Sequence, residues 1–181
     1  MQNIKSSRLY LRKLTPQDAT ERYAAWLNDP LVNQYLEVRY TTHSIESCRE
    51  FITAMNEDVG HHLFGIFLND SGQHIGNIKL GFIDPRYAHG QLSLFIGERD
   101  AWGKGYATEA IQSLTRYGVD VLALERIEAG CYESNLASLR AFLKSNYQVE
   151  GFLRKKAISG GKRESCFVLA ALKVEWHASH L

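Results

Sequence analysis

The chain has 181 residues, of which 45% are hydrophobic, and its 21 Lys and Arg side chains nearly balance 20 Asp and Glu side chains. This length and composition predict a single globular domain over residues 1–181, and the balanced charge gives no electrostatic reason to expect a nucleic-acid partner. No stretch is apolar enough for a membrane span or a secretory leader, so a cytoplasmic protein that binds no membrane is expected.

The cysteine and histidine patterns argue against a disulfide framework and against a metal site. Cys48, Cys131 and Cys166 lie far apart, are odd in number and stand in apolar patterns, which predicts buried, reduced thiols. The 7 histidines form no His-Glu-x-x-His string and no Cys/His pairing at zinc spacing, so no metal is expected.

The first third of the chain predicts one strand followed by helices. Residues 8–14 alternate as a strand does, and Thr15 begins a helix, with proline in its first position, that ends before Pro30. Ser44 begins a further helix, whose apolar positions keep helical spacing as far as Val59.

Short strands and two helices fill the rest of the chain. A helix is predicted over residues 106–122, where apolar side chains recur at intervals of three and four, and another begins at Asn135. The predicted strands, bounded by turn residues, are 62–68, 73–83, 91–96, 126–132, 147–152 and 165–172.

The strand–loop–helix junction over residues 91–110 is the most informative part of the sequence. Gly103 and Gly105 separate a strand from an amphipathic helix, so unpaired backbone N–H groups converge at the positive end of a helix dipole, where phosphate binds well. A P-loop is excluded because no Gly-x-x-x-x-Gly-Lys-Ser/Thr string occurs. A Rossmann fingerprint fits poorly, because Thr108 stands in place of its third glycine.

This junction resembles motif A of the GNAT superfamily of acetyl-CoA-dependent N-acetyltransferases, and most of all its branch of ribosomal-protein N-terminal (Rim-type) enzymes. The string concerned is Trp102-Gly103-Lys104-Gly105-Tyr106-Ala107-Thr108-Glu109-Ala110, in which Trp replaces the Gln or Arg that usually leads the motif. The resemblance implies that the residues from Trp102 to Thr108 bind acetyl-CoA through its pyrophosphate.

A second string supports the first. Asn135-x-x-Ser138, followed by Asn146-Tyr147, resembles motif B of the same family. The resemblance implies that the Asn135 side chain holds the pantetheine arm, a role compatible with capping a helix. It also implies, over nearly the whole chain, an α/β (α+β) fold with a mixed, mostly antiparallel sheet of about seven strands flanked by helices.

The resemblance further implies where the chemistry takes place. Backbone N–H groups of Phe95, Ile96 and Gly97, on a splayed strand, are expected to polarise the thioester, and such donors have been worth roughly 2.7–4 kcal/mol each where measured. Phe142 stands where many relatives have a tyrosine acid, so Ser138 is the candidate acid, unless it is an ordinary helix-surface serine. A thiol, with a pKa of about 8.5, leaves readily in any case.

The position of the general base bears on the acceptor. The glutamate that serves many relatives as base corresponds here to Gln91, which cannot usefully accept a proton. An α-amino group, with a pKa of about 7.7–8.0, is neutral at pH 7 far more often than lysine, with a pKa of about 10.4, so an α-amino terminus or an amino sugar is the favoured acceptor. A carboxylate facing the acetyl group, Glu133 or Asp84 for instance, or a water-relayed base would remove this argument.

The resemblance places the acceptor pocket at residues 33–40 and 158–162. Tyr35, Glu37 and Arg39 could recognise a polar acceptor there, although as isolated residues they are also typical of ordinary surface. An acidic pocket would favour a polyamine, whereas Arg39 or Lys162 in the pocket would favour an anionic acceptor.

The predicted function is therefore transfer of an acetyl group from acetyl-CoA to a primary amine, on a small molecule or a protein N-terminus, by direct transfer in a ternary complex. A homodimer is compatible with this prediction. The alternatives are a polyamine acetyltransferase, transfer of a longer acyl group, and a non-catalytic module that binds acyl-CoA.

Overall fold

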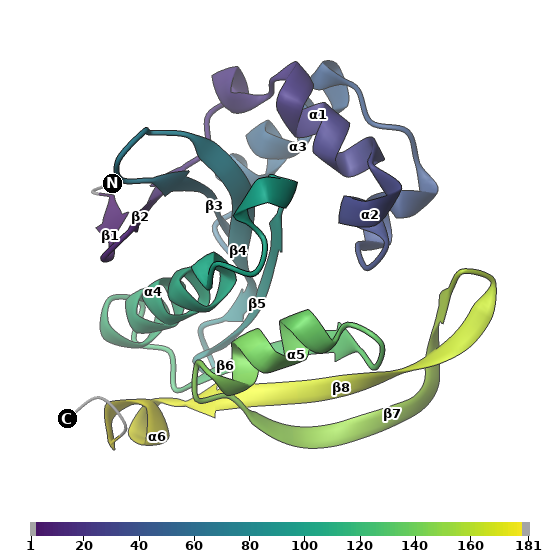
Figure 1. Ribbon diagram of the computed structural model, residues 1–181. Helices are drawn as coiled ribbons and strands as arrows, with labels where there is room; N and C mark the ends of the chain where they lie inside the picture. The colour runs from purple at the N-terminus through teal and green to yellow at the C-terminus, as the bar shows by residue number, and fades with distance from the viewer. Residues whose placement is uncertain (1–2, 179–181) are drawn as a thin grey trace.

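The computed structural model describes residues 3–178, which form one 8-stranded sheet with helices on both faces (Figure 1). The strand order is β1-β2-β3-β4-β5-β6-β8-β7, and all neighbouring strands are antiparallel except β5 and β6, which are parallel. The predicted fold class is confirmed, and the sheet has a short additional strand, β1, at its edge. The strands are β1 (Ile4–Lys5), β2 (Leu9–Lys13), β3 (His62–Leu68), β4 (His74–Asp84), β5 (His89–Ile96), β6 (Arg126–Tyr132), β7 (Gln148–Ser159) and β8 (Lys162–Leu172).

Helices connect the strands and cover the sheet. The α-helices are α1 (Glu21–Asn28), α2 (Pro30–Asn33), α3 (Ile45–Glu57), α4 (Tyr106–Asp120), α5 (Leu136–Leu143) and α6 (Lys173–Ala178), and the 3₁₀ helices are η1 (Pro16–Asp18), η2 (Glu37–Tyr40) and η3 (Arg99–Ala101). The short α6, which follows β8, was not predicted.

The helix expected to begin at Thr15 is corrected by the structure. Thr15 does cap a helix, but that helix is the 3₁₀ segment η1, and the chain is extended at Ala19. A second N-cap, Thr20, whose side chain accepts from the Tyr23 N–H, then begins α1. Two successive N-caps, Thr15 and Thr20, thus divide what the apolar spacing alone predicts as one helix.

The second helix begins where the sequence predicts and ends earlier. Ser44 caps α3 by accepting from the Ser47 N–H. The helix ends at Glu57, and Val59, which was expected on its apolar face, is 94% exposed. The helical spacing of Val59 is therefore fortuitous.

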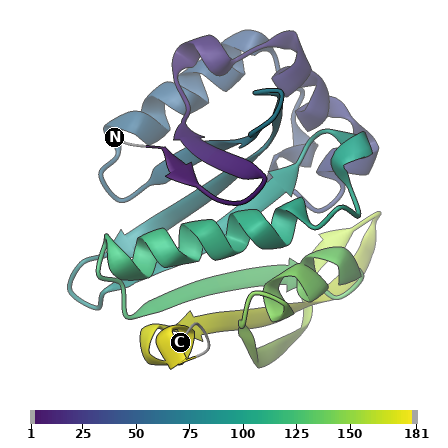
Figure 2. The same ribbon diagram turned by 60° about the vertical axis from the view of Figure 1, so that its left-hand side comes forward.

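Two apolar clusters lie on opposite faces of the sheet. The larger contains Ile111 and Leu114 of α4, together with Phe142 of α5. The smaller contains Trp26 of α1 and Ile52 of α3. Figure 2 shows α4 and α5 across one face of the sheet, with the N-terminal helices gathered at the other side.

The last hairpin is longer than predicted and extends beyond the other strands (Figure 1). β7 continues to Ser159, where the sequence predicts a strand ending at 152, and its register with β8 shifts between Leu153 and Ala157. This bulge bends the hairpin and carries its tip toward η2.

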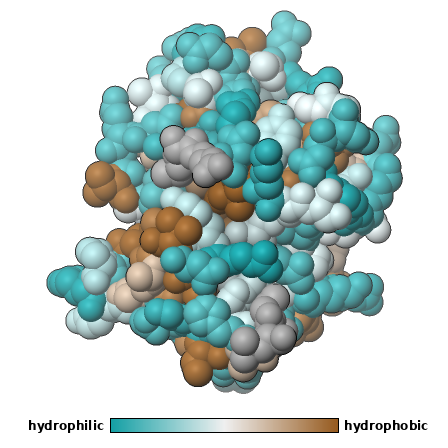
Figure 3. Space-filling model, turned by 90° about the vertical axis from the view of Figure 1, so that its left-hand side faces the viewer, coloured by the Kyte–Doolittle hydropathy of each residue, from teal (hydrophilic) through white to brown (hydrophobic). Residues whose placement is uncertain are grey.

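The cysteines and the outer surface agree largely with the composition. All three cysteines are free thiols; Cys48 and Cys131 are buried as predicted, whereas Cys166 is only partly buried. The face in Figure 3 is mainly hydrophilic with separate apolar patches. Within residues 3–178, no helix has the length and apolarity needed to cross a membrane.

Gly97, directly after β5, tests how tightly α1 packs on the sheet. A Cβ at Gly97 would lie 2.1 Å from Cδ2 of the rigid Trp26 indole. We expect Gly97→Ala to lower the free energy of unfolding by about 1–3 kcal/mol, measured by urea titration, because the core has no room for the methyl group.

The matched control is Gly130→Ala. A Cβ at Gly130 meets its nearest neighbour, the Phe167 carbonyl oxygen, at an ordinary 3.6 Å. Equal urea midpoints for the two variants would contradict this account of the α1 contact.

Candidate active site

The parallel strands β5 and β6 separate in the middle of the sheet. Their pairing consists of His89 with Arg126, Gly90 with Ile127 and Gln91 with Glu128. Both strands continue beyond these pairs, and each stays paired on its outer side, β5 with β4 and β6 with β8. The sheet therefore has an opening between Gln91 and the end of β5.

The alternation of the β4–β5 ladder decides which N–H groups face this opening. The Gly97 N–H donates to the Ile75 carbonyl at 2.8 Å, so Gly97 belongs to a hydrogen-bonded pair, and Phe95, two residues earlier, also faces β4. The N–H groups of Leu94 and Ile96 point the other way, toward β6. Of the three donors expected from the sequence, only Ile96 faces the opening. The N–H groups of Phe95 and Gly97 face β4 instead, and Leu94 is the other residue whose N–H faces the opening.

The glycine loop lies at the end of the opening and leads into α4. Gly103 and Gly105 have φ values of 72° and 82°, and Gly105 is the N-cap of α4, without a side-chain cap among the described residues. The Trp102 indole donates to the Ile96 carbonyl at 2.8 Å, which ties the loop to β5. The first N–H groups of α4 are thus left for a ligand.

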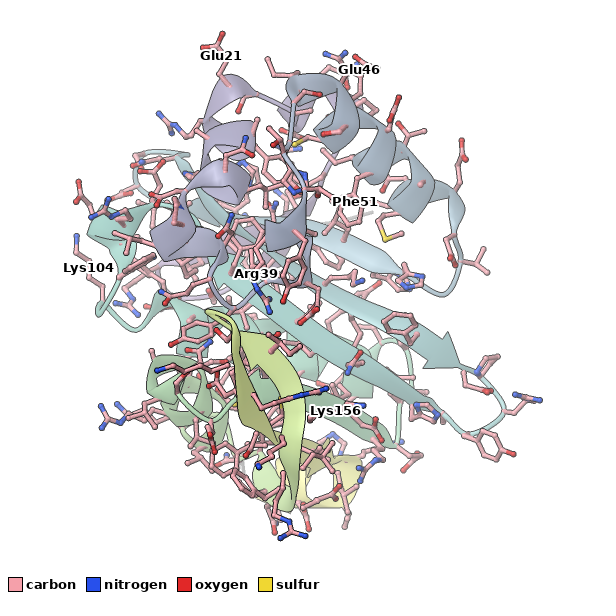
Figure 4. All side chains as sticks on the ribbon, turned by 90° about the vertical axis from the view of Figure 1, so that its right-hand side faces the viewer. Glu21, Arg39, Glu46, Phe51, Lys104 and Lys156 are labelled. Atoms are coloured by element: carbon pink, nitrogen blue, oxygen red, sulfur yellow. The ribbon has the colours of Figure 1, made fainter. Side chains whose placement is uncertain are left out.

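An ion pair from the other end of the chain fixes this loop. Arg8 donates through Nη1 to the Lys104 carbonyl at 2.8 Å and through Nε to Glu109 at 2.7 Å. Glu109 also accepts from the Arg8 N–H at 2.6 Å and from the Ser6 hydroxyl at 2.8 Å. The Lys104 side chain is exposed at the edge of the molecule (Figure 4). Rigid loop geometry therefore depends on Arg8 and Glu109, which the sequence analysis did not single out.

The first turn of α5 carries the motif B residues. Asn135 is its N-cap, and the Asn135 side-chain oxygen accepts from the Ser138 N–H at 3.2 Å. Phe142 is buried in the core, edge-to-face with Tyr147. The Tyr147 hydroxyl is buried and hydrogen-bonded to Thr115 at 2.9 Å, so it does not replace the absent tyrosine acid.

The expected acceptor residues converge at the end of β6. Arg39 donates through Nη2 to the Tyr132 hydroxyl oxygen at 2.9 Å, and that hydroxyl donates to Glu37. The Tyr35 ring packs against Tyr132, and the Tyr35 hydroxyl accepts from Ser134 at 3.2 Å. The three residues of the sequence prediction are therefore brought together, around a tyrosine that the prediction missed.

Arg39 also joins this cluster to the hairpin tip. Its Nη2 donates to the Ile158 carbonyl at 2.7 Å, and the Tyr40 hydroxyl donates to the same oxygen at 3.0 Å. In Figure 4, Arg39 lies between the N-terminal helices and the tip of the β7–β8 hairpin. The guanidinium is largely buried, so it serves as a clasp rather than as an open anion site.

Gln91, at the position of the family's base, and Asp84, one of the two carboxylates named as a possible base, lie at different distances from the glycine loop. Gln91 is exposed at the last position of β5 that pairs with β6. Asp84 lies opposite His89, at the far end of β5 from the glycine loop, and its hydrogen bonds with Arg86 lower the pKa of Asp84 to about 2. Asp84 is therefore not placed to face the acetyl group. Within residues 3–178, no cluster of His, Cys, Asp and Glu is arranged to hold a metal ion.

Comparison with known proteins gives a consistent result. A family model described as an acetyltransferase (GNAT) domain matches residues 8–148. The uncharacterized N-acetyltransferase p20 of Bacillus licheniformis is 30% identical over 179 residues, which cover 97% of this chain and 99% of that protein.

Solved structures share the fold. A GNAT-family acetyltransferase of Bacillus anthracis has a TM-score of 0.81 at 25% identity, covering 96% of this chain and 99% of that one. A spermidine N-acetyltransferase of Vibrio cholerae, solved with CoA and spermine, has a TM-score of 0.86 at 20% identity, covering 95% and 99%. At that identity the second likeness concerns the fold alone.

The Glu109 carboxylate gives a testable pH dependence. Burial alone would raise the pKa of Glu109, but the hydrogen bonds from Arg8 and Ser6 outweigh it and lower the pKa. A lowered pKa stabilises the folded protein above the unfolded-state pKa, of about 4.3, and this stabilisation is lost as the pH falls through the folded-state value. We expect Glu109→Gln to lose about 1 kcal/mol of stability at pH 7, and the difference from wild type to shrink in acid.

Urea titrations at several pH values measure this difference. Glu46→Gln is the matched control, because Glu46 pairs with Arg49 on the exposed surface of α3. A Glu109→Gln deficit that stays the same from pH 7 to pH 3 would contradict the assignment.

Proposed function

The chain belongs to the GNAT family of N-acetyltransferases, and we propose that it passes the acetyl group of acetyl-CoA directly to a primary amine in a ternary complex. The observation that carries this proposal is the opening between β5 and β6, which leads to the glycine loop and the first turn of α4. The proposed acceptor is an α-amino terminus or a small-molecule amine such as an amino sugar.

The residues present fit the phosphate and pantetheine parts of acetyl-CoA. Apart from Gly103 itself and its two chain neighbours, nothing lies within 4 Å of the position of a Cβ at Gly103, so a ligand can approach the loop backbone closely. The N–H groups of the loop and of the first turn of α4 are assigned to the pyrophosphate, and Asn135 to the pantetheine arm. Acetyl-CoA, when bound, supplies the acetyl group as an activated thioester.

Backbone donors in the opening are assigned the electrostatic role. The N–H groups of Leu94 and Ile96 face β6 across the opening and are proposed to donate to the oxygen that gains negative charge as the amine attacks. Rigid donors of this kind act mainly on the transition state, because the sheet has already oriented them. Ser138 is assigned to the proton that the departing sulfur takes up.

The acceptor side favours an amine that is easily deprotonated. Gln91 has no basic group, and an α-amino group, with a pKa of about 7.7–8.0, supplies far more neutral amine at pH 7 than a lysine does. Polyamine transfer stays the rival reaction, since Glu37 and Glu164 lie on the acceptor side. The rival from another class is a module that binds acyl-CoA without turnover.

Release of free CoA from acetyl-CoA tests the proposal. The acceptors are a peptide with a free α-amino group, spermidine, and a nucleotide-linked amino sugar. Turnover with the peptide or the sugar is the expected result, and turnover with spermidine alone would favour the rival. Protein that binds acetyl-CoA and turns over none of the acceptors would instead support the non-catalytic module.

The phosphate cradle has its own test. We expect Gly105→Val to abolish acetyl-CoA binding in calorimetry while the fold survives, because a β-branched residue is strained at a φ of 82° and displaces the loop N–H groups.

Gly161→Val is the matched control. Gly161 has a φ of 75° at the hairpin tip, with nothing within 4 Å of a Cβ. The Gly161→Val substitution imposes similar backbone strain away from the cradle, so the affinity of this variant for acetyl-CoA should equal that of wild type. Wild-type affinity in Gly105→Val would refute the assignment of this loop.

A further inference from the structure

One proton of the proposed reaction has no assigned acceptor. An ammonium group must lose a proton before its nitrogen can attack, and the Gln91 amide cannot take it. We propose that the Glu37 carboxylate takes this proton, with Tyr132 and Arg39 as positioning residues. This inference rests on the proposed function and adds a catalytic residue to it.

The parallel register places Tyr132 beside the opening. Gln91 pairs with Glu128, so four residues further along each strand Tyr132 is level with Phe95. Cys131, its neighbour in β6, belongs to the apolar cluster under α4. Because side chains alternate along a strand, the Tyr132 side chain lies on the opposite face, away from α4. An amine that enters from that face meets the opening where Tyr132 and Glu37 stand.

The Glu37 carboxylate is fixed at one oxygen and open elsewhere. Oε1 accepts from the Tyr132 hydroxyl and lies 3.6 Å from Arg39 Nη1. The Arg39 side chain is only 11% exposed, whereas the Glu37 side chain is 78% exposed. The buried pair thus orients a carboxylate that a substrate, or one bridging water, can still reach.

Two other carboxylates near the opening are held by partners outside the Tyr132–Arg39 pair. Glu128 pairs with Arg126 at 2.8 Å, and Glu164 accepts from the Ser134 N–H at 2.8 Å. Glu133 is exposed next to Tyr132 and is the rival that an experiment must separate from Glu37.

The charges around Glu37 come from three elements. Arg39 and Tyr40 belong to η2, as Glu37 itself does. Tyr132 is the last residue of β6, and Glu133 follows it. The hairpin contributes Lys156, Glu164 and Cys166. Burial raises the pKa of the Cys166 thiol, Glu164, Glu37 and Glu133 raise it further, and Lys156 opposes them. Both acidic and basic groups therefore surround the Glu37 carboxylate.

The proton balance closes with the groups present. The ammonium gives one proton to Glu37, directly or through one water, and becomes a neutral amine. Its nitrogen then bonds to the acetyl carbon as the carbon–sulfur bond breaks, and the sulfur leaves with the electron pair. The nitrogen loses a second proton, the sulfur takes one up, and exposed Glu37 returns its proton to solvent. The products are one amide, one free thiol and one released proton.

The pH dependence of Glu37→Gln tests this role. With the acceptor that wild type uses best, we expect kcat/KM at pH 7 to fall by about 10-fold, because only about a tenth of an α-amino group is neutral at that pH without a base. The deficit should shrink to a few-fold near pH 9, because an α-amino group with a pKa of about 7.7–8.0 is then mostly neutral without help. Tyr132→Phe keeps the Glu37 carboxylate but removes the hydroxyl that orients it, so this variant should show a smaller loss of kcat/KM with the same dependence on pH.

Two further glutamates complete this series. Glu46→Gln, on the far surface of α3 (Figure 4), should behave as wild type at every pH. An unchanged Glu37→Gln, a deficit equal at all pH values, or the pH-dependent loss in Glu133→Gln instead would each overturn the proposal.

A spectroscopic titration of the free protein gives a second readout. Burial raises the pKa of Tyr132, Glu37 raises it further, and Arg39 opposes them. Glu37→Gln should therefore lower the pKa of the one tyrosine whose signal Tyr132→Phe removes. An unshifted titration would overturn the contact on which the proposal rests. If the wild-type protein turns over no acceptor, that result contradicts the proposed function as well. If wild type is active and Glu37→Gln is equally active, only the assignment of Glu37 is contradicted.

Discussion

The loss of pairing between β5 and β6 after Gln91 is the constraint on which the rest of the site depends. Unpaired backbone groups inside a sheet are costly unless a ligand or water bonds them. The two strands can separate because β4 and β8 hold their outer sides, and because apolar clusters on both faces fix the sheet around the gap. The opening is therefore a rigid feature of the fold, present before any ligand arrives.

The two sides of this opening are built by different means. On one side, the glycine loop and α4 offer backbone N–H groups, and Arg8 and Glu109 hold them from the edge of the sheet. The other side is formed by side chains, because Glu37, Arg39 and Tyr132 are hydrogen-bonded to one another although they come from elements distant in sequence. A backbone cradle suits a ligand shared by a whole family, while side chains can vary with the acceptor.

Local chemistry made part of this arrangement predictable. Capping residues such as Ser44 and Asn135 act within one helical turn, and the glycine loop lies between a strand and a helix with clear periodicity. The directions of the N–H groups in β5 could not be predicted in this way, because they depend on the register with β4. That register turns the N–H groups of Phe95 and Gly97 toward β4 and that of Leu94 toward the opening. The Arg8–Glu109 pair joins residues 101 positions apart, so no local sequence pattern predicts it. In the sequence Tyr132 is indistinguishable from any other strand residue, because its role depends on the contact between β6 and η2 in the folded protein.

The clasp at the hairpin tip has an evolutionary consequence. Arg39 and Tyr40 bond the main-chain oxygen of Ile158 rather than its side chain, and every residue type presents that oxygen. The residue at position 158 can therefore change during evolution, and with it the surface offered to an amine, while the hydrogen bonds from Arg39 and Tyr40 to the hairpin tip are kept. Diversification of acceptor preference and retention of the catalytic frame are then compatible within one lineage.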